Sequence, residues 1–210
     1  MTQSTRIPIQ KELSNLVENL TTAETDVAKK LVPDGVNGVQ WVDGGGSDVS
    51  AHHGFFDYND TSTSASPITL LTDTWTDVPN DGLGAFTNLN YVPTGMTKLM
   101  DTSNGSLDFT ELTLGSDVLI RIDFNVTPQT NNALLESRYV LGTGAGLYSL
   151  PIVSRRLDSG AGIPYSSEKG SFYIYMGDTN TLDNPGTLQV KLSTGGTLVN
   201  NGLAIKVYKK

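Results

Sequence analysis

The sequence predicts a mainly β protein, an antiparallel β-sandwich preceded by a short N-terminal helical segment. Three observations lead to this prediction. The 210 residues include 22 glycines, and turn-forming Thr, Ser, Asn and Asp recur along the chain, as expected for many short strands joined by tight loops. Beyond Gly54, hydrophobic residues alternate with polar ones, which is typical of strands buried on one face. Only residues 9–31 follow the period of a helix.

The helical segment carries an apolar stripe whose members are spaced by four and three residues, a heptad pattern. An alternative is two short helices that break near Leu20, because Thr21 and Glu24 match a capping box. Either helix ends before Pro33. A helix of this length is marginal alone in water, so the stripe packs on its own β-domain, meets copies of itself or docks on another protein; we favour the last two. The stripe consists of Ile9, Leu13, Leu16, Leu20, Ala23 and Val27.

The domain boundary is expected in residues 33–50, which combine a short apolar group at Val39, Trp41 and Val42 with the flexible run Gly44-Gly45-Gly46. We therefore predict an N-terminal helical anchor and glycine-rich linker over residues 1–51. A jelly-roll β-sandwich follows over residues 52–210.

The strands of the sandwich are predicted from alternation. The clearest is 118–126, where Val118, Ile120 and Ile122 alternate with more polar residues. Eight to ten strands without interleaved helices imply two packed antiparallel sheets. The other predicted strands lie near 53–58, 68–72, 74–78, 97–101, 107–112, 134–141, 147–153, 171–177, 188–192 and 203–207.

The strand at 171–176 breaks the alternation because both of its faces are apolar or aromatic. If one face lines the core, the other places Tyr173 and Tyr175 toward solvent. Contiguous exposed apolar residues usually mark an interface, and tyrosine suits interfaces because its ring buries while its hydroxyl finds a partner. The alternative is a loop of the same chain that covers the strand. We predict that Tyr173 and Tyr175 lie in a contact between subunits.

Several phrases of the sequence resemble the C-terminal jelly-roll modules, similar to C1q and TNF domains, of bacteriophage fibre and decoration proteins. The resemblance spans about residues 55–210 and lies in strand rhythm and short phrases. It implies a homotrimer whose N-terminal segment is fastened to the virion, and it carries over no catalytic residue. The phrases are Trp75 through Pro79-Asn80-Asp81-Gly82, Phe109-Thr110-Glu111-Leu112, Val118-Leu119-Ile120-Arg121-Ile122-Asp123 and Val199-Asn200-Asn201-Gly202.

Composition excludes several classes of function. A net charge of −8 disfavours nucleic acid, whose binding depends on clustered Lys and Arg. The absence of cysteine removes disulfides, thiolate metal sites and thiol nucleophiles. No run of about 18 apolar residues predicts membrane insertion, and no signal peptide is recognisable. We expect synthesis in the host cytoplasm and residence in the virion.

The remaining motifs for chemistry are weak. His52 and His53 are adjacent and point to opposite sides of an extended chain, without companion ligands. Gly142, Gly144 and Gly146 lack the following helix of a phosphate site and predict a loop or bulge. Residues 178–184 have oxygen ligands for calcium but the wrong spacing, and a turn capped by its own side chains fits better.

Carboxylates offer the last chemical hypothesis. Glycoside hydrolysis needs two of them about 5–10 Å apart, and the candidates are Asp101, Asp108, Glu111 and Asp123. We nevertheless expect no enzymatic activity and no cofactor.

The sequence thus favours a homotrimeric phage fibre or capsid decoration protein that is anchored by its N-terminus to capsid or tail proteins. One alternative is a tail adhesin that binds host surface glycans between loops 142–147, 158–170 and 178–186. The other is a polysaccharide depolymerase that depends on Asp123.

Overall fold

The computed structural model describes residues 29–33, 39–43, 49–158, 160–167 and 171–210, with side chains from Ala51 onward. The chain divides into two units, 1–49 and 50–210, and each is considered by itself. The elements follow in the order β1 Lys29–Pro33, β2 Val39–Asp43, α2 Val49–His52, β3 His53–Asn59, α3 Ser62–Ala65, β4 Ile68–Leu70, β5 Thr76–Asp77, β6 Met100–Asp101, β7 Ser106–Leu107, β8 Asp117–Pro128, β9 Ala133–Leu141, the 3₁₀ turn η1 Gly144–Gly146, β10 Tyr148–Leu157, β11 Tyr165–Ser166, β12 Ser171–Tyr175, α4 Thr179–Leu182, β13 Thr187–Leu192 and β14 Gly196–Tyr208.

The first unit contains a two-stranded antiparallel sheet in which Lys29 pairs with Asp43 and Pro33 with Val39. This corrects two expectations. Residues 29–31 were expected to end the helix, and residues 39–42 were expected in a linker; both lie in strands. Val39, Trp41 and Val42 are residue types with high strand propensity, and that propensity outweighs the linker composition around them. The apolar stripe of Ile9, Leu13, Leu16, Leu20, Ala23 and Val27 lies outside the described residues.

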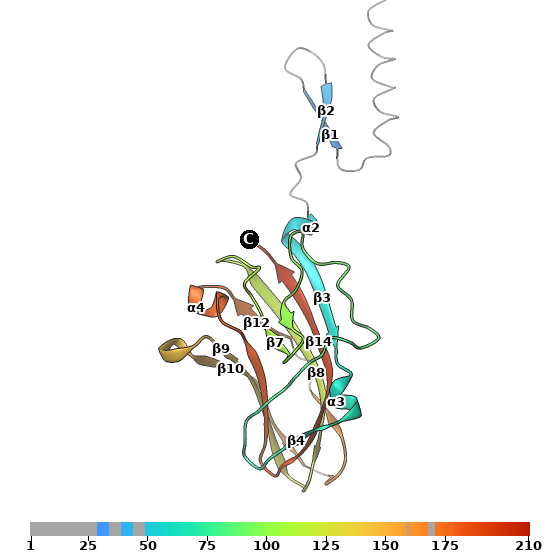
Figure 1. Ribbon diagram of the computed structural model, residues 1–210, viewed down its shortest axis with the longest axis vertical. Helices are drawn as coiled ribbons and strands as arrows, with labels where there is room; N and C mark the ends of the chain where they lie inside the picture. The colour runs from blue at the N-terminus through green and yellow to red at the C-terminus, as the bar shows by residue number, and fades with distance from the viewer. Residues whose placement is uncertain (1–28, 34–38, 44–48, 159, 168–170) are drawn as a thin grey trace, which may run out of the picture. The chain divides into compact units, whose positions relative to one another are not determined.

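The second unit confirms the predicted antiparallel β-sandwich (Figure 1). One sheet has the order β10-β9-β13-β5. The other has the order β11-β8-β14-β3, with β12 also paired to β8 and β4 to β14. We call them the β9 sheet and the β8 sheet. Strands distant in sequence are neighbours in both, which is the crossed connectivity of a jelly roll.

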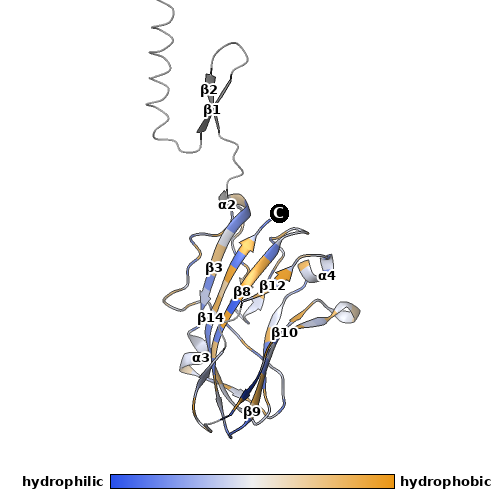
Figure 2. Cartoon of the chain, turned by 180° about the vertical axis from the view of Figure 1, so that it is seen from behind, coloured by the Kyte–Doolittle hydropathy of each residue, from blue (hydrophilic) through white to orange (hydrophobic). Residues whose placement is uncertain are grey.

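The core lies between the two sheets and is built by the alternation that the sequence shows. Along β8 every second residue is buried, with Val118, Ile120 and Phe124 all fully enclosed. The β9 sheet contributes Tyr139 and Val190 from the opposite side. Each such side chain contributes about 1.5–3 kcal/mol to the free energy of unfolding. Figure 2 shows the hydrophobic colour gathered on β8, β12 and β14.

The predicted strands at 74–78, 97–101 and 107–112 are much shorter in the structure, at 76–77, 100–101 and 106–107. Local side-chain hydrogen bonds explain the shortening of the last two. Asp101 Oδ1 accepts from the backbone N–H of Ser103, and Asp108 Oδ1 accepts from that of Thr110. Aspartates that bond the chain two residues on favour turns over sheet ladders.

Two of the sequence phrases meet in the structure. Asn200 Nδ2 donates to Pro79 O at 2.8 Å, and Asn80 Nδ2 donates to Tyr58 O at 3.1 Å. Asn200 also accepts from Gly202 N, next to a break in the pairing of β14 with β8. At Gly202 the backbone has a φ of 126°, a conformation that favours glycine. Asn200 therefore links the 79–82 loop to a bulge in β14, and Asn80 links the same loop to β3.

The two ends of the sandwich unit are tied together. Lys209 N donates to His52 O at 2.6 Å, and His52 Nδ1 lies 2.9 Å from Lys209 O. Lys210 is held as well, because Thr113 Oγ1 donates to its carbonyl at 2.9 Å. The chain thus begins and ends the sandwich at one place.

Candidate functional site

Strand β12 carries the two tyrosines that the sequence singled out. Tyr173 and Tyr175 are 54% and 53% exposed, whereas Ile174 between them is buried. β12 is paired on one side with β8, from Ser171–Arg121 to Tyr175–Asp117. Among the described residues no loop of the same chain buries the two rings.

Strand register shows that the tyrosines belong to a larger surface. Residues directly opposite one another in an antiparallel pair point to the same face. Tyr175 is opposite Asp117, which is opposite Tyr208. One row further, Tyr173 is opposite Leu119.

Further members follow from the same registers, because Tyr208 is opposite His53. The exposed apolar and aromatic residues of these rows are named the aromatic face: His53, Leu119, Tyr173, Tyr175 and Tyr208.

A shallow groove of about 380 Å³ runs over the aromatic face. Its lining includes Leu119, Tyr173 and Tyr208, with one acid, Asp117, and one base, Lys206. The rings of His53 and Tyr208 meet edge to face, with centroids 4.8 Å apart. Desolvation, followed by the negative charge of Asp117, raises the pKa of Tyr173, so its hydroxyl is neutral near pH 7 and can donate a hydrogen bond. The groove is an apolar surface with a small number of polar anchors.

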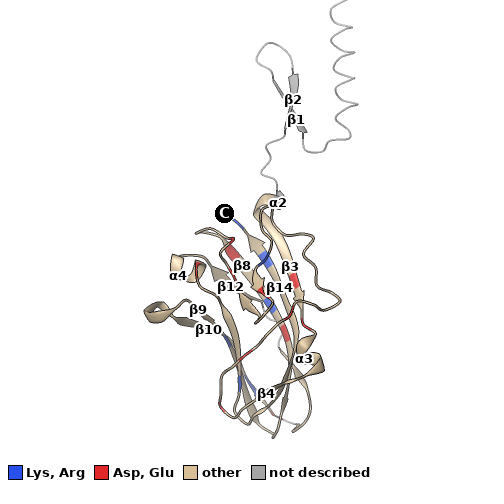
Figure 3. Ribbon diagram, in the orientation of Figure 1, with Lys and Arg blue, Asp and Glu red and all other residues tan. Residues whose placement is uncertain are grey.

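The β8 sheet becomes polar toward its other end. Asp57, Arg121, Asp123 and Asn201 line a small hollow of about 40 Å³. Burial raises the pKa of Asp57, and the charge of Arg121 opposes that rise. Figure 3 shows that acidic and basic residues mix on β3, β8 and β14. The aromatic face is therefore confined to one end of the sheet.

A second exposed apolar surface was missed by the sequence analysis. It is the apolar loop, residues 83–91, with Leu83 76%, Phe86 80% and Tyr91 69% exposed. Its backbone is bonded to β3: Asp57 and Asn88 exchange two hydrogen bonds of 3.0 and 2.9 Å. Its apolar residues follow no period, so neither a helical nor a strand pattern could find them. In the sequence, the one sign of this surface is a group of apolar residues that lies between turn-forming residues.

The outer face of the β9 sheet is organised differently. Trp75 is half-buried there, with the Arg138 guanidinium 4.0 Å from its ring centroid and the Lys191 ammonium at 5.0 Å. Lys191 also pairs with Glu136 at 2.7 Å. Arg138 Nε donates to Gln189 Oε1 at 3.0 Å. In this group, the Trp75 cluster, both cations cover the aromatic ring and each also has a polar partner.

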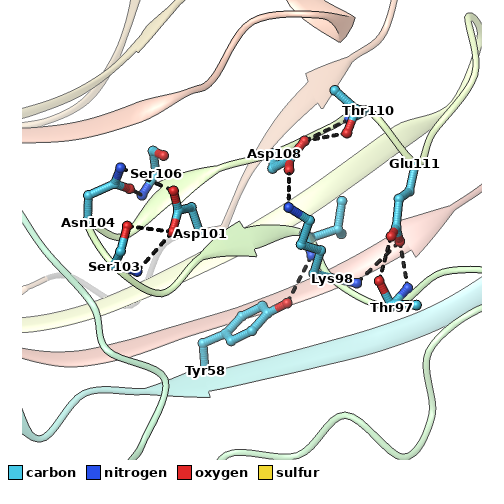
Figure 4. Close-up of polar contacts among 11 residues, drawn as sticks. Tyr58, Thr97, Lys98, Asp101, Ser103, Asn104, Ser106, Asp108, Thr110 and Glu111 are labelled. Carbon is cyan, nitrogen blue, oxygen red and sulfur yellow. Dashed lines mark hydrogen bonds and ion pairs between the residues drawn. The ribbon is translucent and has the colours of Figure 1, made fainter.

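The carboxylates considered for hydrolysis each make local hydrogen bonds or ion pairs, and Figure 4 shows those of Asp101, Asp108 and Glu111. Asp101 caps the turn at Ser103, Asp108 pairs with Lys98 at 2.7 Å, and Glu111 accepts hydrogen bonds from Thr97 and Lys98. Asp123 lies apart from them on β8, where it accepts from Asn201 Nδ2 at 3.3 Å. Each carboxylate is engaged in holding a loop or strand.

The pKa shifts of these carboxylates agree with a structural role. Partial burial of Asp108 and Glu111 works against the charged form, but hydrogen bonds from Thr110 and Lys98 to Asp108, and from Thr97 to Glu111, outweigh it and lower both pKa values. Hydrogen bonds from Ser103 lower the pKa of Asp101. A general acid for glycoside hydrolysis needs a raised pKa, and these three are shifted the opposite way.

The other motifs also have structural roles. His52 is bonded to Lys209 and His53 packs on Tyr208. Within the described part of the chain, no three His, Asp or Glu side chains are grouped to hold a metal ion. Asp178 caps α4, accepting from Thr181 N at 2.8 Å, which confirms the self-capped turn in the 178–184 segment. Residues 144–146 form a short 3₁₀ turn between β9 and β10.

The three loops expected to form one sugar site do not come together. Asn180 joins the first and third, accepting from Thr143 N and donating to Gly146 O. The second is bonded elsewhere, since Gly160 N donates to Asn131 and Gly162 N to Pro128. These sites lie beyond opposite ends of β9, whose nine residues extend roughly 27 Å. The described residues of the three loops therefore do not line one common pocket, whereas the first and third loops are joined through Asn180.

Comparisons with known proteins give distant similarities in structure. The chain is similar to Eiger TNF from S. frugiperda, with 10% identity, a TM-score of 0.40 and coverage of 76% of this chain and 94% of that one. It is also similar to the PRD1 vertex protein P5, with 20% identity, a TM-score of 0.33 and coverage of 76% and 96%. A third similarity, to a chain of infectious bursal disease virus Gt strain, has 12% identity, a TM-score of 0.29 and coverage of 85% and 36%. No protein-family model and no curated sequence matches. None of the helices in the described residues is long and apolar enough to cross a membrane.

Proposed function

We propose that this protein is a structural protein of a virion surface that assembles as a homotrimer through its aromatic face. The observation that supports the assembly is the exposure of Tyr173 and Tyr175 beside Leu119 and Tyr208. Soluble monomers rarely expose contiguous apolar patches of this kind. Covering the patch with another copy removes it from water and leaves the tyrosine hydroxyls to find partners.

The virion role rests on the resemblance of residues 55–210 to phage fibre and decoration modules, together with the N-terminal heptad stripe. The segment of residues 1–40 attaches the chain to a capsid or tail protein, and the sandwich projects outward. Three copies on one axis then present three identical sets of loops. Linking weak sites in this way raises avidity by roughly 10²–10⁴, which suits reinforcement of a shell or weak contact with a host surface.

The role is mechanical, without an enzymatic step or a cofactor. The carboxylates that would serve a depolymerase each hold a local turn or strand, and three of them have lowered pKa values. Purified protein should leave polysaccharide viscosity unchanged, and an Asp123→Ala variant should behave in the same way. A fall in viscosity that Asp123→Ala abolishes would establish the depolymerase instead.

Neutral host glycans remain the ligand class that a net charge of −8 permits best, because acidic polymers are repelled. The glycans would bind at loops 142–147 and 178–184, which Asn180 joins by hydrogen bonds. A glycan array decides between decoration and adhesion. Saturable binding of one sugar class assigns the adhesin role, whereas absence of binding by a folded trimer leaves the decoration role.

Assembly and attachment are tested separately. Light scattering of the full chain should give about 67 kDa, three times the 22.5 kDa of one copy. Deletion of residues 1–35 should leave a soluble sandwich but abolish its incorporation into particles. A monomer at micromolar concentration contradicts the trimer, and incorporation of the deletion variant contradicts the anchor.

A further inference from the structure

The polar end of the β8 sheet contains a hollow whose floor and walls follow from the strand register. Ala204 on β14 lies opposite Asp57 on β3 and opposite Arg121 on β8. Residues directly opposite one another share a face of the sheet, and the Cα atoms of Asp57 and Arg121 are two strand spacings apart, roughly 9.6 Å. Between these two charged walls, β14 contributes only the methyl group of Ala204.

A β-bulge adds a second row to the hollow. The pairing of β14 with β8 is broken between Asn200 and Gly202, so Asn201 and Gly202 both lie on the outer face beside Asp123. Gly202 also lies opposite Asn59 on β3. A Cβ added at Gly202 would lie 2.2 Å from the backbone of β3, so glycine alone permits this close approach. The second row therefore has no side chain on its floor.

The polar groups around the hollow are only partly used within the chain. Asn59 Nδ2 donates to Asp57 Oδ1 at 3.2 Å, and Asn201 Nδ2 donates to Asp123 Oδ1 at 3.3 Å. Both distances lie at the long end of the usual range. Among the described residues neither Oδ2 atom accepts a hydrogen bond, and the Arg121 guanidinium forms no ion pair. Acceptors and donors are therefore both open to a ligand.

The mixture of charges determines which ligand suits the hollow. Burial raises the pKa of Asp57, whereas the charge of Arg121 lowers it, so a carboxylate and a guanidinium act on the same space (Figure 3). A cationic ligand would lie beside Arg121 and an anionic one beside Asp57 and Asp123, so either would meet a like charge. Carboxylates only accept hydrogen bonds and a guanidinium only donates them, but a hydroxyl does both. Two adjacent hydroxyls are needed to reach both rows.

We infer that the hollow binds a vicinal diol of a neutral saccharide, with its hydroxyls donating to Asp57 and Asp123 and accepting from Arg121. The hollow has a volume of about 40 Å³, which admits one or two hydroxyl groups and not a whole sugar ring. The site therefore recognises one edge of a sugar, whose ring stays outside. This inference goes beyond the proposed homotrimer and does not rest on it, and it concerns a place separate from loops 142–147 and 178–184.

Ligand-observed NMR on the full chain tests the site with the methyl glycosides of glucose, galactose and mannose. These neutral probes present different vicinal diols, and at least one should bind saturably, with a Kd on the order of 1 mM. Asp123→Asn should weaken that binding about tenfold, because a charged acceptor is lost. The matched control Glu136→Gln removes one negative charge from β9 and should leave the binding unchanged. Binding that Asp123→Asn does not weaken would overturn the inference.

Ala204→Val tests the shape of the hollow without changing any charge. The larger side chain fills the floor, so binding of the methyl glycosides should be lost. The matched control is Ser154→Val on β10, opposite Glu136, which enlarges an exposed side chain away from the hollow and should have no effect. Circular dichroism establishes that both variants are folded. If folded Ala204→Val protein binds as well as the wild type, the sugar lies elsewhere and the inference fails.

Charged analogues distinguish a hydroxyl site from an ion site. The amino sugar and the uronic acid that correspond to the best neutral probe should each bind more weakly than that probe, because each places a charge beside a like charge. Tighter binding of the amino sugar would replace the inference with a cation site. Tighter binding of the uronic acid would replace it with an anion site.

Light scattering of the same samples separates this inference from the proposed homotrimer. A trimer that binds none of the probes refutes the diol site and leaves the assembly intact, whereas a monomer that binds them refutes the assembly alone. Binding that appears only in a dissociated Leu119→Asp variant would mean that a neighbouring copy covers the hollow, and it would overturn the inference for the assembled protein.

Discussion

The outer faces of the two sheets differ in whether other side chains cover their aromatic rings. On the β9 sheet the ring of Trp75 lies under Arg138 and Lys191, and Glu136 pairs with Lys191. On the β8 sheet, Tyr173 and Tyr175 have no such cover among the described residues. The central strands β8 and β9 both alternate buried residues with less buried ones, so core packing in these strands does not explain the difference. Under the proposed function, the outer face of the β9 sheet contacts water and that of the β8 sheet contacts another copy.

The largest expected effect comes from matched leucines on the two faces. Leu119 on β8 is 41% exposed and Leu134 on β9 is 38% exposed. Leu119→Asp should reduce the mass in solution threefold, because it places a charge in a contact that excludes water, whereas Leu134→Asp should leave the mass unchanged. Light scattering measures both. If the two variants dissociate equally, or neither does, the distinction between the faces fails.

The next effect is on stability alone. Trp75→Ala removes a half-buried ring and leaves Arg138 and Lys191 without their aromatic partner, so the free energy of unfolding should fall by about 2 kcal/mol. Urea denaturation followed by circular dichroism measures this fall. The mass in solution should not change, and a loss of trimer would mean that the Trp75 cluster also takes part in assembly.

The inner faces of the sheets can be compared through two buried tyrosines. Tyr139 Oη in the β9 sheet has no hydrogen-bond partner among the described residues, and burial raises its pKa. Tyr139→Phe should therefore raise the free energy of unfolding by about 1 kcal/mol. Tyr58 Oη in the β8 sheet accepts from Leu99 N at 2.9 Å, so Tyr58→Phe should lower it by a similar amount. Opposite signs in denaturant titrations support this reading, and equal signs refute it.

The smallest effect concerns acid and the segment 97–111, which belongs to neither outer face. The folded pKa of Glu111 lies below its ordinary value of 4.5, as burial is outweighed by the hydrogen bonds from Thr97. Its contribution is therefore present above pH 4.5 and is lost as the pH falls through the folded pKa. Glu111→Gln should make the melting temperature fall less between pH 6 and pH 3. An unchanged slope would show that other carboxylates determine acid stability.

Sequence reasoning found the long strands because their alternation is also their burial pattern. β8, β9, β13 and β14 were all predicted within a few residues, except for the start of β14. The short helix α3 was missed because hydrogen bonds from individual side chains decide it. For α3, the carboxylate of Asp60 accepts from Thr63 N at 2.8 Å and Thr63 Oγ1 donates to Asn200 O at 3.1 Å. A partner 137 residues away leaves no local pattern.

The candidate site was predictable only in part for a related reason. Tyr173 and Tyr175 stood out because they break a pattern, but Leu119 and Tyr208 sit in strands that alternate correctly, and only the register reveals that they share a face. Phe86 gave no periodic signal at all. The carboxylates were grouped by the sequence although their roles differ. Asp101, Asp108 and Glu111 lie close in sequence, but each makes its own local contacts.

The hydrogen bonds between His52 and Lys209 also determine where peptides can be fused to this sandwich. Because the first and last residues of the sandwich lie next to each other, a peptide fused after Lys210 would begin beside the strand that starts at His53. The turns near Asn131 and Gly160, joined by a 3.0 Å hydrogen bond, lie at the other end of the sandwich and are the place to insert a peptide that should stay away from both of its termini.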